Sequence, residues 1–306
     1  KEEIMDINQY KTIGSINKKH LISLTNYTAE EIYEILKRAK DIFDRLAAGE
    51  KQYSLKNKYI YLITKSGFSR SRIAFETAVT KLSGSYTVSS LPGAKIDEVL
   101  TDSLSMKAIA YYGVDAIVVR TELSTDAEVL EKHVNLPIIN ANPQSGPLEA
   151  LSALLTVWER KGRLGGLKIS MIGNPTIFAE SFIYAFIKCG ADVTIVCPNG
   201  YNPDERTLNY CAQYGDLTIT NDLSDGIKDA DCIYVSDDYA AASFTLTNDV
   251  LINAKPSVMV LHSLPIPKDS AVISADIINS PAFAGLTLAE NLQKVEMAVL
   301  DLLVAE

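Results

Sequence analysis

Hydrophobic residues recur along the chain with two different periods. Short apolar runs at 59–63, 115–119 and 168–172 are typical of strands that are buried on both faces. These runs alternate with segments such as 28–49, in which apolar residues return every three or four positions, as they do in amphipathic helices. The alternation predicts a parallel β-sheet with helices on both faces.

The alternation occurs twice and predicts an α/β protein with two similar domains, 1–149 and 150–287. Residues 146–166 lie where the first series ends and the second begins. They are mostly apolar and end in two glycines, so we expect a buried helix that joins the two domains. A closing helix is predicted at 288–306.

Composition excludes several classes of protein. The 306 residues are 47% hydrophobic and 22% charged, with a net charge of -9. The overall field therefore repels nucleic acid and anionic membranes, and an anionic ligand needs a local basic pocket. No run of 18 apolar residues and no signal-type segment is found, which predicts a cytoplasmic protein. The four cysteines form no CxxC pair, so we expect buried thiols and not zinc or redox ligands.

The strongest candidate for anion binding follows the first predicted strand. The stretch Lys65–Ala78 reads KSGFSRSRIAFETA and places Ser69, Arg70, Ser71 and Arg72 where the strand gives way to a helix. A helix N-terminus offers unpaired backbone N–H groups, and hydroxyl and guanidinium groups at that point complete a cradle for an oxyanion. The alternative is two surface arginines in a loop.

Three more candidates lie near predicted strand ends, where ligands bind in open parallel sheets. Arg120 ends the run at 115–119, and Ser90 and Lys95 lie in a loop whose hydroxyl and ammonium groups suit phosphate capture. For each, a surface charge or an ordinary polar loop is the alternative.

The second domain offers a histidine and two carboxylates. His262 ends an apolar strand and suits hydrogen bonding to a ligand or proton transfer, although a structural histidine is equally compatible with the pattern. Asp237 and Asp238 follow another strand, and either carboxylate could hold a substrate amine or lie in a solvated loop. The sequence contains no GxGxxG, P-loop, GxSxG or HExxH motif.

Four of these segments match motifs that occur together in one enzyme family. Phe68–Arg72, followed by IAFETA, matches a phosphate motif S-T-R-T-R followed by xSFETA. DAIVVR, which ends at Arg120, matches DAIVxR; Gly146–Glu149 falls on H-P-x-Q, and His262–Ile266 falls on H-C/P-L-P-R. In these motifs and their order the chain resembles the aspartate/ornithine carbamoyltransferase family over essentially its whole length.

The resemblance implies a carbamoyl-phosphate-type domain, an amino-acid-type domain, and a closing helix that packs back on the first. In the family an amine attacks the carbonyl carbon of carbamoyl phosphate and phosphate leaves, without a metal or other cofactor. The resemblance also implies a homotrimer in which a neighbouring subunit supplies the Ser/Lys loop, so that active sites are shared.

The same resemblance assigns residues to roles. Those expected to bind the phosphate group are Ser69, Arg70, Ser71, Arg120, Ser90 and Lys95. Those expected to take part in catalysis are Arg70, Ser71, Arg120 and His262. Those expected near the acceptor are Asp237, Leu264 and Glu149.

The chain departs from the family at four motif positions. Phe68 replaces a phosphate-binding serine, and Gly146 replaces the histidine that donates to the carbamoyl oxygen. Glu149 replaces a glutamine, and Ile266 replaces an arginine. Losing one such donor typically slows a reaction by about 10² to 10³. The acceptor motifs differ as well, so neither ornithine nor aspartate is expected to bind in the usual mode.

Two hypotheses remain open from the sequence. In the first, the protein is a divergent enzyme that transfers a carbamoyl or related group from carbamoyl phosphate to the amine of an unidentified amino-acid-like acceptor. In the second, it is an inactive paralogue that binds an anion or serves as a partner subunit. The two hypotheses are distinguished by whether another hydrogen-bond donor, such as Asn142 or Gln144, replaces the donor that is missing at Gly146.

Overall fold

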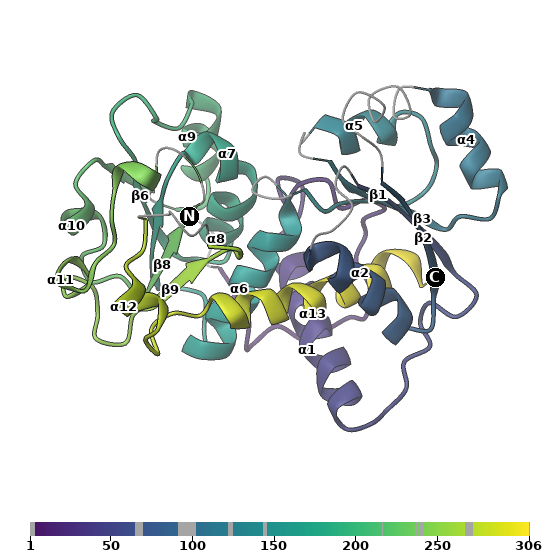
Figure 1. The fold of residues 1–306 in the computed structure, drawn as a ribbon, viewed down its shortest axis with the longest axis horizontal. Coiled ribbons are helices and arrows are strands. Elements are labelled where there is room, and N and C mark those ends of the chain that lie inside the picture. Colours follow the sequence, from purple (N-terminus) through teal and green to yellow (C-terminus); the bar gives the residue numbers. More distant parts are fainter. Residues whose placement is uncertain are drawn as a thin grey trace. The chain divides into compact units, whose positions relative to one another are not determined.

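The computed structural model describes residues 4–64, 70–90, 102–121, 125–142, 146–215, 217–236, 238, 241–266 and 272–305 (Figure 1). The chain divides into two compact units, which are named here after the side chains discussed below. The arginine unit comprises Lys11–Tyr27, Glu31–Leu151 and Leu292–Glu306. The histidine unit comprises Lys1–Tyr10, Thr28–Glu30 and Ser152–Asn291.

The arginine unit contains a four-stranded parallel sheet with the order β2-β1-β3-β4. Its strands are β1 (Tyr59–Thr64), β2 (Ser85–Ser90), β3 (Ala116–Arg120) and β4 (Ile138–Asn140). The chain leaves β1 toward β2 on one side and then places β3 and β4 on the other. The direction of winding therefore reverses between β1 and β3, which is the switch point at which open α/β sheets bind ligands.

Helices follow the strands of this unit as the alternation predicts. They are α1 (Ala29–Ala47), α2 (Arg70–Lys81), α4 (Ser103–Tyr111), α5 (Thr125–Glu131) and parts of α6 (Pro147–Lys161) and α13 (Gly285–Val304). Strands β3 and β4 are buried almost continuously, as expected where helices cover both faces of a sheet, whereas β2 is largely exposed. One face forms a core with α4 and α5 that includes Ile63, Met106, Ile117, Val119 and Leu130.

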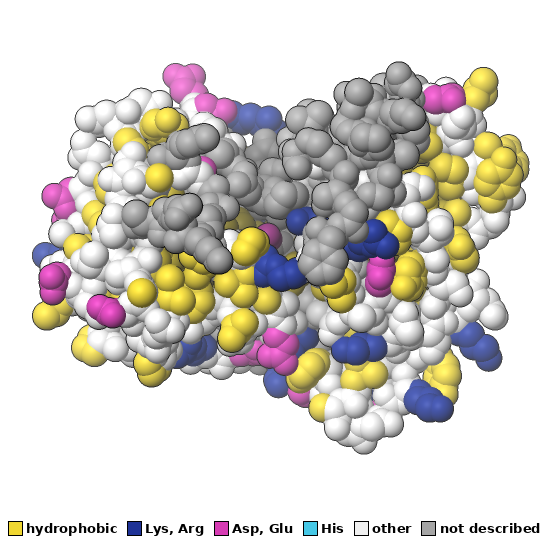
Figure 2. Space-filling view, viewed as in Figure 1, with side chains coloured by type: hydrophobic (Ala, Val, Ile, Leu, Met, Phe, Trp, Pro, Cys, Tyr) yellow, Lys and Arg dark blue, Asp and Glu magenta, His cyan; other side chains and the backbone are white. Residues whose placement is uncertain are grey.

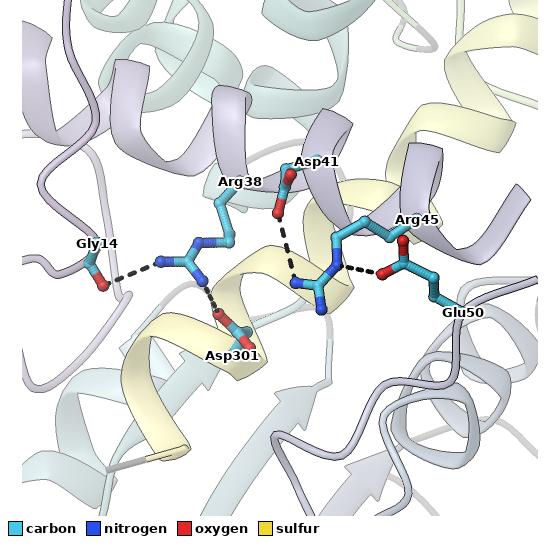
Figure 3. A network of polar contacts seen from close by, with 6 residues as sticks. All are labelled: Gly14, Arg38, Asp41, Arg45, Glu50 and Asp301. Carbon is cyan, nitrogen blue, oxygen red and sulfur yellow. Dashed lines mark hydrogen bonds and ion pairs between the residues drawn. The ribbon is translucent and has the colours of Figure 1, made fainter. Parts of the chain in front are cut away.

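Helix α13 is joined to α1 by a charged contact (Figure 3). The guanidinium group of Arg38 pairs with Asp301 at 3.0 Å and donates to the carbonyl oxygen of Gly14 at 3.0 Å. About two turns further along α1, Arg45 pairs with Asp41 of its own helix and with Glu50 of the following loop. The last turns of α13 are therefore anchored within the arginine unit.

The histidine unit contains a five-stranded parallel sheet with the order β7-β6-β5-β8-β9. Its strands are β5 (Lys168–Ile172), β6 (Asp192–Val196), β7 (Leu217–Thr220), β8 (Cys232–Val235) and β9 (Met259–His262). Here the winding reverses between β5 and β8. Both units therefore have the same kind of switch point, formed by the first strand of each sheet and the strand that begins the second direction.

The remaining helices of the histidine unit are short. They are α7 (Pro175–Phe178), a π-helix (Ala179–Ile183), α8 (Tyr184–Lys188), α9 (Glu205–Cys211), α10 (Leu223–Gly226), a 3-10 turn (Ala241–Ser243), α11 (Asn248–Leu251) and α12 (Ala275–Ile278). The sequence predicts one regular helix after β5, whereas the structure interrupts it with the π-helix. A single π-turn widens the helix by one residue and leaves no hydrophobic periodicity by which it could be recognised.

The structure confirms the predicted fold class. The sequence pattern predicts a helix over about 203–215, but α9 spans only Glu205–Cys211, and Asp204 caps its start by accepting from the backbone N–H of Thr207 at 2.8 Å. All four cysteines are buried free thiols, as expected. In the ranges given above, no helix is both long and apolar enough to cross a membrane.

Candidate functional site

The switch point of the arginine unit brings three predicted residues to one edge of the sheet. Thr64, the last residue of β1, is paired with Ser90 of β2 on one side and with Arg120 of β3 on the other. Arg70 begins α2, the helix that follows β1. Strand ends and the start of a helix thus meet where the sequence predicts an anion site.

The two arginines of the KSGFSRSR stretch have different environments. Arg70 is exposed at the start of α2, where partial burial of its guanidinium group lowers its pKa and the Glu149 carboxylate acts in the opposite direction. Arg72 instead pairs with Glu76, one turn along the same helix, at 2.6 Å. Ser71 lies between them and is half-buried. Arg70 therefore stays the candidate for anion binding, whereas Arg72 belongs to an intrahelical ion pair.

Arg120 is held in place by the neighbouring strand. Its Nη1 atom donates to the carbonyl oxygen of Ala141, just after β4, at 2.9 Å. The side chain is half-buried, so part of its positive charge is shielded from water. A guanidinium group has five N–H donors in a fixed plane, and fixing one of them orients the rest.

The segment after β4 is tied back to β3. The Oδ1 atom of Asn142 accepts from the backbone N–H of Thr121 at 2.5 Å and from its hydroxyl group at 3.3 Å. A Cβ atom placed on Gly146 would lie 2.0 Å from the carbonyl oxygen of Asn142. This backbone therefore admits only glycine at position 146. The amide oxygen of Asn142 is used within the protein, and Gln144 lies outside the described residues.

Two glutamates accompany the arginines. Glu149 is half-buried in the first turn of α6, where the helix dipole favours a negative charge. Glu296 on α13 is 0% exposed, and neither carboxyl oxygen has a hydrogen-bond partner among the described residues. Burial raises the pKa of Glu296 well above its usual value; Arg120 opposes this and Glu149 adds to it. The sequence analysis missed Glu296, although an acid within the apolar run VEMAVL is a recognisable signal.

In the histidine unit, His262 ends β9 and is 0% exposed. Its Nδ1 atom lies 2.7 Å from the carbonyl oxygen of Val235 on β8, so Nδ1 carries the proton and donates it. The Nε2 atom is buried and has no partner in the described part of the chain. His262 is thus a ring fixed through Nδ1, and its Nε2 atom is unused within the described residues. Leu264, two residues further on, is half-buried.

The carboxylate of Asp238 joins the ends of β5 and β8. It accepts from the backbone N–H groups of Asn174 at 2.9 Å and Ala241 at 2.8 Å, and from the hydroxyl group of Ser236. Gly173 has φ +142°, and a Cβ atom there would lie 1.8 Å from Oγ of Ser236. Asp238 therefore has a structural role in this loop.

Several predicted site residues lie outside the described residues, and their roles stay predictions. They are Ser69, Lys95 and Asp237, together with the side chain of Ser90 and the departure at Phe68. Ile266, the departure in the last motif, is half-buried. Within the described ranges, no three His, Cys, Asp or Glu side chains gather as a metal site requires.

Two parallel sheets with charged side chains at both switch points define an α/β protein with a candidate anion site at the edge of one sheet, and comparison with known proteins supplies the family. Residues 19–159 match the family model "Aspartate/ornithine carbamoyltransferase, carbamoyl-P binding domain". Residues 165–303 match "Aspartate/ornithine carbamoyltransferase, Asp/Orn binding domain". The chain belongs to the aspartate/ornithine carbamoyltransferase family.

Individual relatives agree with this assignment. Ornithine carbamoyltransferase of Pyrococcus abyssi is 31% identical over 311 residues, which cover 95% of this chain and 97% of that protein. The structure of ornithine carbamoyltransferase from Pyrococcus furiosus superimposes with a TM-score of 0.85 at 29% identity and covers 95% of this chain and 98% of that one. Aspartate transcarbamoylase from Trypanosoma cruzi, solved with carbamoyl phosphate and aspartate, shares the fold with a TM-score of 0.84 at 19% identity, covering 97% and 100%.

Proposed function

We propose that this protein transfers a carbamoyl group, or a closely related group, from carbamoyl phosphate to the amine of an amino-acid-like acceptor. The observation that carries the proposal is the placement of two arginines next to one switch point: Arg120 pairs with Thr64 at the end of β1, and Arg70 begins the helix that follows β1. Two guanidinium groups at the carboxyl edge of a parallel sheet suit a phosphate dianion.

The proposed reaction needs charge stabilisation and no redox step. The acceptor nitrogen forms a bond to the carbonyl carbon, the bond from that carbon to the phosphate oxygen breaks, and phosphate leaves with the electron pair. The amine loses a proton. Arg70 and Arg120 stabilise the charge that grows on the leaving phosphate, together with Ser71 and, as predictions, Ser69, Ser90 and Lys95.

The acceptor is proposed to differ from ornithine bound in the usual mode, although the relatives named above include ornithine carbamoyltransferases. In the histidine unit, Thr176 is exposed and its backbone N–H and hydroxyl groups bond to the Asn174 side chain at 3.0 and 2.8 Å. Asp238 is occupied by backbone donors. The acceptor residues left as proposals are Asp237, Leu264 and Glu149, with His262 offering Nε2 to an N–H donor.

A catalytically inactive paralogue is the second candidate, and one observation favours it. The backbone at Gly146 excludes any side chain, so no donor to a carbamoyl oxygen can come from that position. Under this alternative the two arginines still bind an anion, but no group is transferred.

Titration calorimetry followed by a turnover assay tests the proposal. Carbamoyl phosphate is expected to bind more tightly than inorganic phosphate, and a panel of amino acids that includes ornithine and aspartate is then screened for phosphate release. Release that depends on one amine establishes the transferase. Tight binding without release from any amine supports the inactive paralogue, and no binding of either anion refutes both.

We also propose that the protein is a homotrimer with shared active sites and that residues 1–149 and 150–287 are its two domains. Figure 2 shows hydrophobic side chains gathered over α4, and Leu104, Tyr111 and Tyr112 there are 76%, 90% and 81% exposed. Such exposure supports a surface that a second copy covers. Light scattering of the purified protein tests the trimer. The cytoplasmic location stays a prediction.

A further inference from the structure

Glu296 is a buried glutamate whose surroundings the reaction described above does not explain. It lies on α13 among buried apolar residues, with 0% exposure, and its two carboxyl oxygens have no partner among the described residues. An ionised carboxylate in such a place is costly, because no hydrogen bond from the described residues replaces its lost hydration. A group of this kind normally takes up a proton instead.

The position of Glu296 connects it with the proposed anion site. One turn earlier on α13, Gln293 donates to the hydroxyl group of Thr77 at 2.5 Å and accepts from Lys81 at 2.7 Å. Both partners belong to α2, the helix that begins with Arg70. Helix α13 is thereby fixed along the helix that carries the anion-binding arginine.

Two charged side chains influence the protonation of Glu296, and they come from two different elements. Arg120 at the end of β3 attracts the carboxylate, and Glu149 in the first turn of α6 repels it. The charged groups by which α1 and α2 contact α13 engage other residues: Arg38 pairs with Asp301, and Lys81 bonds to Gln293. Whether the Glu296 carboxyl group is protonated therefore depends on its burial, on Arg120 and on Glu149.

We propose that Glu296 is a charge-setting residue of the anion site: held as a neutral acid, it leaves Arg70, Arg120 and Glu149 with one net positive charge. If Glu296 loses its proton, the four groups sum to zero and a phosphate-type anion loses its electrostatic attraction. Glu296 acts through Arg120 and Glu149 and is a positioning residue. This inference rests on the proposed function only in that the two arginines bind the anion.

Sulfate is the probe that tests the inference, because its charge stays constant between pH 5.5 and 9 whereas that of phosphate does not. Its dissociation constant is measured by calorimetry across this range. For the natural protein, affinity is expected to stay level while Glu296 is protonated and to fall by up to about tenfold per pH unit above its pKa. Glu296→Gln, which mimics the neutral acid, is expected to bind sulfate with the same affinity throughout.

Glu290→Gln is the matched control, because Glu290 is exposed on the same helix and the substitution removes the same charge. It is expected to keep the pH profile of the natural protein. Equal profiles for the natural protein and Glu296→Gln overturn the inference while leaving the anion site intact. No sulfate binding by any variant at any pH overturns both the anion site and the inference. Thermal melts confirm that each variant is folded.

Discussion

The two switch points have the same topology but use their charged side chains differently. In the arginine unit, the Glu149 carboxylate favours the charged form of Arg70, and Arg120 donates to the carbonyl oxygen of Ala141. In the histidine unit, Asp238 accepts two backbone N–H bonds and one hydroxyl bond. Parallel-sheet topology therefore places charged groups at an edge, but the local hydrogen bonds decide whether a charge faces a ligand or closes a loop.

This difference can be tested by disturbing each switch point separately. If the histidine unit uses its polar groups for structure, substitutions there reduce stability. If the arginine unit uses its charges for binding, substitutions there reduce affinity and leave stability nearly unchanged.

The largest effect on stability is expected from Gly173→Ala. The new Cβ atom would lie 1.8 Å from Oγ of Ser236, and φ at this position is +142°, which side chains rarely adopt. Steric overlap and backbone strain together are expected to lower the free energy of unfolding by about 3 kcal/mol or more, measured by urea denaturation. Gly200→Ala is the control, because φ there is +94° but nothing lies within 4 Å of the added atom. A similar loss in both variants would show that the contact with Ser236 is unimportant.

The largest effect on binding is expected from Arg70→Ala. A hydrogen bond to a charged group contributes about 1.5–3 kcal/mol, so the dissociation constant of carbamoyl phosphate should rise by roughly 10- to 150-fold. Arg72→Ala is the matched control, because that guanidinium group is paired with Glu76. The assignment of Arg70 fails if the two variants bind the anion equally well.

Asp238→Asn is expected to have a smaller effect, and on stability alone. The amide keeps one acceptor oxygen but places an NH₂ group against one of the donors, Asn174 N–H, Ala241 N–H or Ser236 O–H. A loss of about 1–2 kcal/mol in the free energy of unfolding follows from the cost of an unmade buried hydrogen bond. Anion affinity measured by calorimetry should not change. A marked fall in affinity with unchanged stability would mean that Asp238 faces a ligand.

Much of this architecture could be predicted from the sequence, because hydrophobic periodicity reports burial directly. The apolar runs predicted the strands, and the rule that ligands bind at strand ends selected Arg70 and Arg120 before Arg120 was seen to pair with Thr64. Both arginines lie next to elements whose order the pattern defines.

What the sequence could not provide depends on which side chains meet in three dimensions. Arg70 and Arg72 look equivalent in the sequence, but only Arg72 has an ion-pair partner one turn along its own helix. Asp238 looks like a ligand-binding carboxylate until its backbone donors are seen. Glu296 and Asp301 are acids on the same helix, and only the packing of α13 shows that Glu296 is the buried one.

The last comparison is of stability at different pH values, and it concerns Glu296 alone. Because burial raises its pKa in the folded protein above the value near 4.5 in the unfolded chain, the folded state binds more protons between these two values. Stability contributed by the neutral acid is therefore complete below pH 4.5 and is lost as pH rises toward the raised pKa, by up to about 1.4 kcal/mol per pH unit.

Glu296→Gln removes this loss and should exceed the natural protein in urea stability at pH 8, with little difference near pH 4.5. Glu290→Gln on the exposed side of the helix should follow the natural protein at both pH values. The advantage of Glu296→Gln over the natural protein is expected to be larger at pH 8 than at pH 4.5. If it is not larger, the Glu296 carboxyl group is already ionised in the folded protein. Glu296 would then add a negative charge beside Arg120 and would not be a neutral acid.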